Sequence, residues 1–460
     1  MHCRIRSVCR CLLALGLAAS LGAAAPEPGW KAGAARSNIT PEKLMWMSGF
    51  GSRTKPADGK LTDLWAKALA LEDGGGKRVV LVTMDLVGID RGVSLRVCRE
   101  LQKKYGLRRE QIVLNVSHTH SGPVVGENLK STWFLDDAGW RLVDEYTAGL
   151  EQKLVAVVGQ ALERLTPATL SYGNGFADFA VNRRNNKAPD VPRLRELHQL
   201  KGPNDFDVPV LAVRNPQGEL QAVAFGYACH ATTLSIYQWN GDYPGFTQAQ
   251  LEREHPGVVA LFWAGCGADQ NALPRDTIER SQAYGARLAT AVDAQLAQKL
   301  TPLAPRFVCE YREIPLPLGR LPTREDLQHD VTSTNKYIVS RARLLLAQLD
   351  RGQALSPTYP YPVEVWRLGD ALTWIFLGGE VVVDYSLRLK RELGESSTWV
   401  AGYSNDVMAY IPSLRVLGEG GYEGATAMIY YGLPTAWSPA VEETIVKQVG
   451  AEVEAARIGR

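Results

Sequence analysis

Apolar runs alternate with amphipathic segments along most of this chain, which is the pattern of an α/β protein. Residues 78–89 (RVVLVTMDLVGI) and residues 111–116 (QIVLNV) are rich in β-branched side chains and predict buried strands. Between them, residues 93–105 have helical spacing and end before Gly106. This strand–helix–strand order predicts a βαβ unit with partly parallel strands, followed by a long helix over residues 140–165.

The second half of the chain has shorter apolar runs. We expect hairpins at residues 208–228 and 363–377, because the turn sequences NPQG and GD separate paired runs. The Gly-rich segment 403–424 predicts a loop over a site. The other predicted elements are a strand at 258–263 and helices at 280–299, 381–393 and 441–458. No repeat or shift in composition divides the chain, so the expected fold class is α/β, with a mixed β-sheet core flanked by helices in a single large domain.

The first residues follow the order of a secretory signal peptide. Three arginines among the first ten residues precede an apolar run at residues 11–22, and small residues lead to Ala25. The run is too short to cross a bilayer, and an uncleaved anchor helix is the alternative. We expect a signal peptide at residues 1–25, a mature domain at residues 26–460, and export to the periplasm or the exterior.

Composition changes this picture little. The 460 residues are 45% hydrophobic and 22% charged, close to a soluble globular average, with a formal net charge of +2. No basic block stands out, so no nucleic acid partner is expected. Four cysteines follow the predicted signal, and their spacing fits no cysteine zinc motif; disulfides and free buried thiols are both open. They are Cys98, Cys229, Cys266 and Cys309.

Two histidines stand at the end of a predicted strand. His118 and His120 point to the same face of an extended segment, where neutral imidazoles can bind Zn²⁺. His230 ends the apolar run AVAFGYACH and is the best third candidate. Glu380 follows TWIFLGG on buried backbone, and a metal would offset the cost of burying its carboxylate. The alternatives are structural histidines and an acidic residue at a helix N-terminus.

The segment NVSHTHSGP at residues 115–123 resembles the neutral/alkaline non-lysosomal ceramidase family. Further matches follow in order and span about residues 37 to 449: SGFGSR, VNRR, CHATTLS with NGDYPGF, LGGEVV, and YSNDVMAYIP with YEGA. The resemblance implies one catalytic zinc ion, whose ligands would be His118, His230, Glu380 and Tyr410. It also places His120, Arg183 and Tyr422 around the scissile amide. Arg183 and Tyr422 would stabilise the oxyanion, His120 would protonate the leaving amine, and Asp242 would orient a ligand histidine.

Two departures from the family bear on the substrate. The loop GCGADQNALPR has Asp269, Gln270 and Asn271 where family members have a serine. We also expect no counterpart of the family's C-terminal immunoglobulin-like domain. The resemblance implies a secreted zinc-dependent amidohydrolase that cleaves ceramide or a related N-acyl lipid and touches a membrane or micelle surface; the oligomeric state is open. The alternatives are a zinc hydrolase of another amide or ester, and a non-catalytic lipid- or glycan-binding protein. Trp133 and Phe134 would contact a lipid tail or pack in the core.

Overall fold

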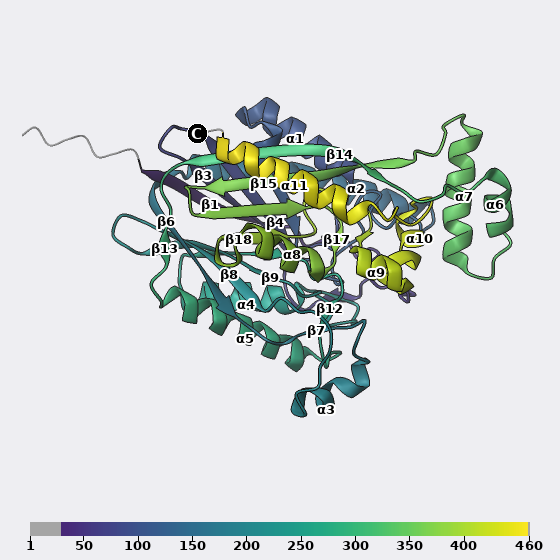
Figure 1. Cartoon of the computed structure of the whole chain (residues 1–460), viewed down its shortest axis with the longest axis horizontal. Coiled ribbons are helices and arrows are strands. Elements are labelled where there is room, and N and C mark those ends of the chain that lie inside the picture. The colour runs from purple at the N-terminus through teal and green to yellow at the C-terminus, as the bar shows by residue number, and fades with distance from the viewer. Residues whose placement is uncertain (1–28, 459–460) are drawn as a thin grey trace, which may run out of the picture.

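The computed structural model describes residues 29–458, which form two stacked β-sheets between outer layers of helices (Figure 1). The predicted signal peptide lies outside the described residues. The larger sheet has nine strands in the order β11-β9-β8-β6-β1-β3-β4-β5, with β13 paired to β6. These strands are β1 (Trp30–Asn38), β3 (Trp65–Glu72), β4 (Arg78–Met84), β5 (Ile112–Val116), β6 (Thr166–Phe176), β8 (Asp207–Arg214), β9 (Leu220–Tyr227), β11 (Val259–Ala264) and β13 (Thr301–Pro302).

The smaller sheet packs face to face against the larger one. Its order is β14-β15-β16-β18, and its strands are β14 (Phe307–Pro317), β15 (Thr358–Leu368), β16 (Leu372–Leu377) and β18 (Thr398–Ala401). Both faces of the larger sheet are apolar, as strand β4 shows. Its residues Val79 and Leu81 pack between the two sheets, whereas Val80 and Val82 pack under the helices. Tryptophans fill the space between the sheets, with the rings of Trp263 and Trp374 5.3 Å apart.

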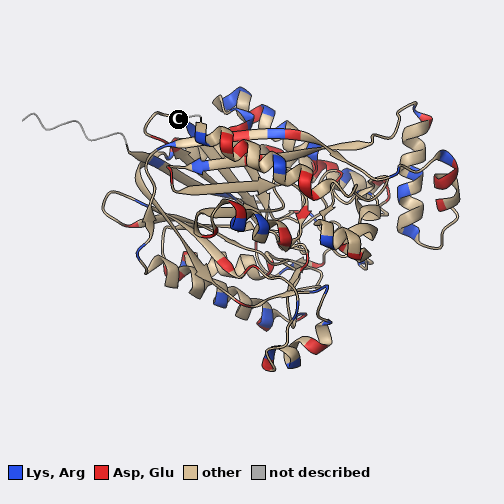
Figure 2. Ribbon diagram, viewed as in Figure 1, with Lys and Arg blue, Asp and Glu red and all other residues tan. Residues whose placement is uncertain are grey.

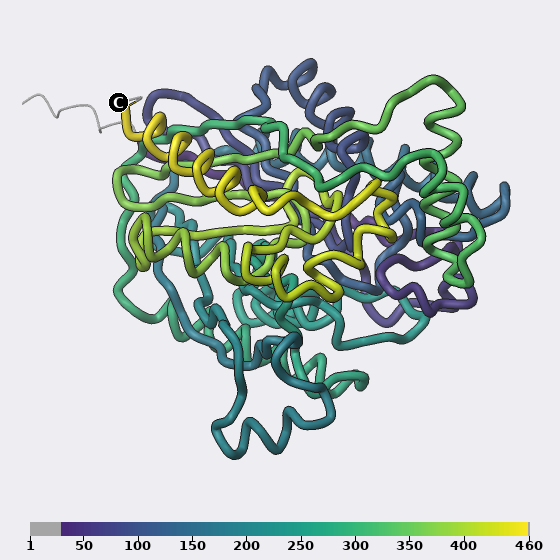
Figure 3. The backbone as a smooth tube through the Cα atoms, turned by 45° about the vertical axis from the view of Figure 1, so that its right-hand side comes forward, coloured from purple at the N-terminus to yellow at the C-terminus, as the bar shows by residue number. Residues whose placement is uncertain are grey.

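Helices cover the outer face of each sheet. The larger sheet is covered by α1 (Arg91–Tyr105), α2 (Asp137–Glu163), α4 (Asp242–Glu254) and α5 (Ile278–Leu296), and the smaller by α8 (Val383–Leu393) and α11 (Val441–Ile458). In Figures 1 and 3, α11 runs in yellow across the smaller sheet. The remaining helices are α3 (Val191–Glu196), α6 (Arg324–Asp330), α7 (Lys336–Asp350), α9 (Leu414–Glu419) and α10 (Met428–Tyr431). The pair α6–α7 projects from the body at the right of Figure 1.

The predicted βαβ unit is confirmed, and the structure repeats it twice. Strands β4 and β5 are parallel neighbours joined through α1, and β9–α4–β11 and β16–α8–β18 follow the same plan. Both predicted hairpins are present, as β8–β9 and β15–β16. Segment 403–424 is mostly irregular, as expected, although it contains the short strand β19 (Tyr410–Ile411) and α9. The α/β fold class with a mixed sheet flanked by helices is therefore confirmed.

Several short strand pairs lie outside the two sheets. They pair β2 (Gly59–Lys60) with β10 (Gln238–Trp239), β7 (Ala180–Asn182) with β12 (Gln270–Ala272), and β17 (Glu380–Val381) with β19. The last two pairs bring candidate site residues together. The four cysteines of the described chain are buried and unpaired. Within residues 29–458, no helix has both the length and the apolar composition that a bilayer span requires.

Candidate metal and catalytic site

His118 lies just beyond the end of β5 and contacts the segment that follows β4. Its backbone has a φ of 60°, and its Nδ1 is 2.6 Å from the carbonyl oxygen of Val87. A carbonyl can only accept, so Nδ1 carries the proton and donates. The lone pair of the neutral ring is then on Nε2, which is the arrangement that prepares an imidazole to bind a metal.

His230 is prepared in the same way from another strand. It follows β9, pairs by an isolated bridge with Asn271, and places its Nδ1 2.8 Å from the carbonyl oxygen of Gly267. Backbone carbonyls therefore orient both histidines, and the prediction that Asp242 does so is wrong. The Asp242 carboxylate instead accepts from the Thr233 hydroxyl and from backbone N–H groups, among them that of Leu234 at 2.9 Å.

Glu380 lies between these two histidines. It opens β17, and its Oε2 is 3.2 Å from Nε2 of His118 and 3.1 Å from Nε2 of His230. The other carboxylate oxygen, Oε1, accepts a hydrogen bond from the phenol of Tyr431. Tyr410, opposite Glu380 on β19, has its hydroxyl 3.4 Å from Nε2 of His230. The four predicted ligands thus meet at one buried place.

The lone pairs at this place face one another and fit a cation. Within residues 29–458, buried Glu380 Oε2 accepts no hydrogen bond, and each Nε2 beside it belongs to a ring whose Nδ1 donates to a backbone carbonyl. Such a group of acceptors is repulsive unless a positive charge lies between them. Nitrogen and oxygen donors of this kind suit Zn²⁺. Burial lowers the pKa of His230 to about 4, so its imidazole is neutral at pH 7 and available as a ligand.

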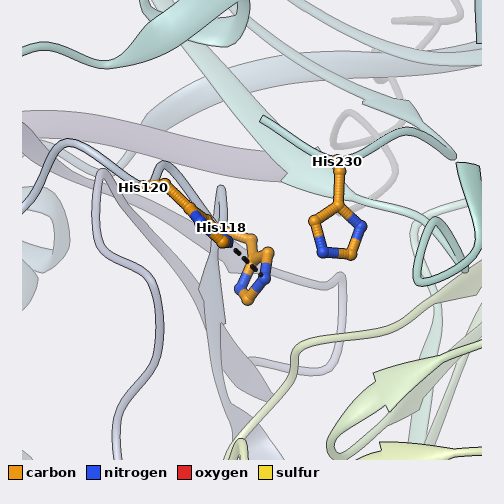
Figure 4. Close-up of side chains that lie close together, drawn as sticks. All are labelled: His118, His120 and His230. Atoms are coloured by element: carbon orange, nitrogen blue, oxygen red, sulfur yellow. Dashed lines mark hydrogen bonds between the residues drawn. The ribbon is translucent and has the colours of Figure 1, made fainter. Parts of the chain in front are cut away.

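His120 is the third histidine of the cluster. Figure 4 shows it beside His118, with His230 on the other side. The Nε2 atoms of His120 and His118 are 3.2 Å apart, and one ligand nitrogen from each of the three rings lies within 4.8 Å of the others. Burial lowers the pKa of His120 well below 6.5, and its buried Nδ1 has no hydrogen-bond partner in the part of the chain that the structure describes. The three histidines could therefore hold a metal ion together, or His120 could stand beside it.

Arg183 and Tyr422 lie on the same side of the cluster. Arg183 follows β7; its Nη2 is 3.1 Å from the Tyr410 hydroxyl, and its Nε donates to Glu423 at 2.7 Å. Tyr422 begins a single π-helical turn (Tyr422–Thr426), and its ring centroid is 5.2 Å from that of Tyr410. The guanidinium of Arg183 is 5.8 Å from each of these rings. The seven predicted residues therefore line one cavity of about 850 Å³.

Sequence reasoning missed two residues of this site. Tyr431 holds Glu380 and follows no pattern that would single it out, whereas Glu423, which holds Arg183, lies in the matched segment YEGA without having been assigned a role. The sequence leaves tail contact and core packing both open for Trp133 and Phe134; Trp133 is buried and donates to the Asn128 carbonyl at 3.2 Å, so it packs in the core. Phe134 is 52% exposed, and its ring centroid is 5.8 Å from that of Tyr337, which lines the cavity.

The fold and the cluster together define an α/β protein with a candidate metal centre. The model of the neutral/alkaline non-lysosomal ceramidase N-terminal region matches residues 30–264, about half of the chain. The chain belongs to this family, as the sequence motifs predict.

Relatives and a solved structure agree with this membership. Neutral ceramidase from Pseudomonas aeruginosa is 28% identical over 54% of this chain, and neutral ceramidase 2 from Arabidopsis thaliana is 29% identical over 47%. The matched segments cover only 37% and 27% of the lengths of those proteins. A crystal structure of the Pseudomonas aeruginosa neutral ceramidase superposes with a TM-score of 0.73 at 19% identity, covering 93% of this chain and 74% of that one. That likeness confirms the fold.

Proposed function

We propose that this chain is a zinc-dependent amidohydrolase that cleaves the N-acyl amide bond of ceramide or a related N-acyl lipid, releasing a fatty acid and an amine. One zinc ion would be held by His118, His230, Glu380 and Tyr410. The observation that carries the proposal is the group of facing lone pairs around Glu380 Oε2, which needs a cation. The family of the chain and the names of its relatives support the amide substrate.

The residues around the cluster suit the steps of amide hydrolysis. When bound, zinc would supply Lewis acidity, polarising the carbonyl and lowering the pKa of water. Arg183 is fixed by Glu423 and presents N–H donors beside Tyr410, where the developing oxyanion would accept them. The phenol of Tyr422 would be a second donor from the cavity wall.

His120 would carry the proton of the reaction. Its low pKa leaves it neutral at pH 7, so it must first accept a proton before it can donate one. Nε2 of His120 would take the proton from the attacking water and pass it to the amide nitrogen as the C–N bond breaks. The ring is held in place by Phe50, whose centroid is 4.7 Å away, and by the close backbone of Gly49.

Export and surface contact belong to the same proposal. A signal peptide at residues 1–25 would deliver the mature domain, residues 26–460, to the periplasm or the exterior. Exposed Phe134 near the cavity suits contact with a membrane or micelle that carries the substrate. A non-catalytic binding protein is disfavoured, because such a protein has no need to retain both the metal-ligand positions and the donors around them.

Metal analysis combined with a substrate panel tests this function. We expect about one zinc per purified chain, and release of amine from N-acyl sphingoid bases or simple acyl amides that stops on chelation and returns with added zinc. His118→Ala should lose the metal, whereas His329→Ala, at an exposed position on α6, should keep it. Protein without zinc, or zinc-loaded protein that releases amine from no substrate, would overturn the proposal.

A further inference from the structure

The cavity around the cluster contains one arginine whose charge is not balanced. Arg183 and Arg184 both pair with Glu423, at 2.7 and 2.6 Å, and Arg184 also pairs with Glu419 at 2.9 Å. Arg275 lines the same cavity, and across residues 29–458 no carboxylate forms an ion pair with it. Among the described residues, its guanidinium donates one hydrogen bond, from Nη1 to the carbonyl oxygen of Thr232 at a long 3.4 Å. The cavity lining has as many glutamates (Glu380, Glu419 and Glu423) as arginines, but Arg275 is the arginine that forms no ion pair among the described residues.

Arg275 is close enough to the cluster to act on the same small molecule. Thr232, which it contacts, is two residues after His230, and two residues of chain span at most about 7 Å. Asn271, on the strand before Arg275, is bridged to His230, and its Oδ1 accepts a hydrogen bond from Nη1 of Arg183 at 3.3 Å. The side-chain NH₂ group of Asn271 donates to no acceptor among the described residues. The side of the cavity formed by Asn271 and Arg275 therefore offers hydrogen-bond donors and positive charge.

The apolar part of the cavity lining is more aromatic than aliphatic. Val87 and Leu129 are its aliphatic side chains, whereas an aromatic wall is formed by Phe50, Tyr337 and Tyr430. A ligand that matches both walls has one apolar arm against the rings and one anionic arm at Arg275. A guanidinium fork is complementary to a carboxylate, which it can bind through two parallel hydrogen bonds. Along the ribbon in Figure 2, Lys and Arg are interspersed with Asp and Glu.

We propose that the substrate is an N-acyl amide with a carboxylate on one arm, and that Arg275 binds this carboxylate. This inference rests on the proposed amidohydrolase function and specifies its substrate class. The carboxylate can stand on the amine side, as in an N-acyl amino acid, or at the far end of the acyl chain. Both present the same anion to Arg275, and the two arms of the experiment separate them.

Paired substrates test the charge preference. We expect kcat/KM to be about 10- to 100-fold higher for N-dodecanoylglycine than for uncharged N-dodecanoylglycinamide. A second pair, the N-butyl amide of a long dicarboxylic acid and its uncharged diamide, shows whether the acyl-side carboxylate is preferred instead. In the preferred pair, Arg275→Gln should reduce the ratio of kcat/KM for the charged substrate to kcat/KM for the uncharged one to about one. Arg275→Lys should keep part of this ratio. The control Arg193→Gln, at an exposed arginine of α3, should keep the full ratio.

A charge reversal and a binding measurement complete the test. Arg275→Glu should invert the preference toward a cationic N-acyl ethylenediamine. Calorimetry on the ketomethylene analogue of N-dodecanoylglycine, in which CH₂ replaces the amide N–H, measures the carboxylate contact without turnover. Charge-selective binding that Arg275→Gln abolishes, without hydrolysis of any amide, would refute the proposed function and leave the carboxylate subsite standing. Hydrolysis with equal rates for charged and uncharged partners, or a ratio unchanged in Arg275→Gln, would overturn the subsite and leave the function standing.

Discussion

Glu380 and Tyr410 stand directly opposite each other in the parallel pairing of β17 with β19. The N–H of Glu380 donates to the carbonyl of Ala409 at 2.7 Å, and the N–H of Val382 donates to that of Ile411 at 3.2 Å. Register partners in a parallel pair project their side chains to the same face. This short pairing therefore brings a carboxylate and a phenol to one point beside His230.

Gly379 permits this pairing, and we predict that Gly379→Ala disrupts it. Its φ is 76°, and an added Cβ would lie 2.7 Å from the Ala409 carbonyl oxygen. We expect a loss of roughly 2 to 3 kcal/mol in the free energy of unfolding, from the backbone strain and the clash, together with loss of bound zinc. Urea denaturation and metal analysis measure the two effects.

Gly352→Ala is the matched control. Gly352 also has a positive φ, 74°, but an added Cβ would meet no atom within 4 Å. We expect about 1 kcal/mol of destabilisation with the zinc content unchanged. Equal zinc content in the two variants would contradict the role assigned to the β17–β19 pairing.

The role of His120 can be distinguished from that of the metal ligands by comparing the zinc content and the activity of alanine variants. We predict that His118→Ala and Glu380→Ala both remove zinc, because each takes away a donor at the centre of the cluster. His120→Ala should keep the metal and lose about 10²- to 10⁴-fold in kcat, which is the usual contribution of a general acid or base. If His120→Ala instead loses zinc, His120 is a third histidine ligand and not the proton carrier.

Arg183 should act on the transition state more than on substrate binding. We predict that Arg183→Gln lowers kcat about 10²- to 10³-fold, equivalent to about 3 to 4 kcal/mol, with a small change in KM. Glu423→Gln should reproduce part of this loss, because it releases the guanidinium from its 2.7 Å contact. Steady-state kinetics on zinc-loaded protein measure kcat and KM of both variants. A change confined to KM would assign Arg183 to substrate binding.

Asp406 should make the stability of the fold depend on pH. Its Oδ2 accepts from the Tyr359 hydroxyl at 2.6 Å, and its Oδ1 has no hydrogen-bond partner among residues 29–458. Burial raises its pKa from 3.8 to about 7. The folded state thus holds a proton that the unfolded chain releases near pH 4. The contribution of protonated Asp406 to the free energy of unfolding is complete below about pH 4. It is lost as the pH rises through about 7, where the carboxyl group of the folded protein releases its proton.

Asp406→Asn tests this expectation, because the amide is uncharged at every pH. Relative to the wild type, the variant should gain stability between about pH 5 and pH 8, as measured by urea denaturation at both values. Asp144→Asn, at an exposed position of α2, should show no such trend. A parallel pH dependence in wild type and Asp406→Asn would show that Asp406 does not titrate on unfolding.

Local patterns along the chain were sufficient for much of the fold. The run at residues 78–89 marks a strand because both faces of β4 are buried, and the helical spacing before Gly106 marks α1. The segment WAKALALE, by contrast, consists mainly of good helix formers, yet it forms β3 between β1 and β4. Helix α4 escaped prediction because Pro244 and Gly245 lie in its first turn.

The candidate site divides in the same way. His118 and His230 could be selected from the chain alone, because each follows an apolar run that carries a polar side chain into the interior. Only the tertiary structure shows that the carbonyls of Val87 and Gly267 orient these rings. It alone also shows that Tyr431 donates a hydrogen bond to Glu380. Periodicity reports the environment of each segment, whereas the pairing register and close packing of distant segments set which atoms meet, and no local pattern encodes that information.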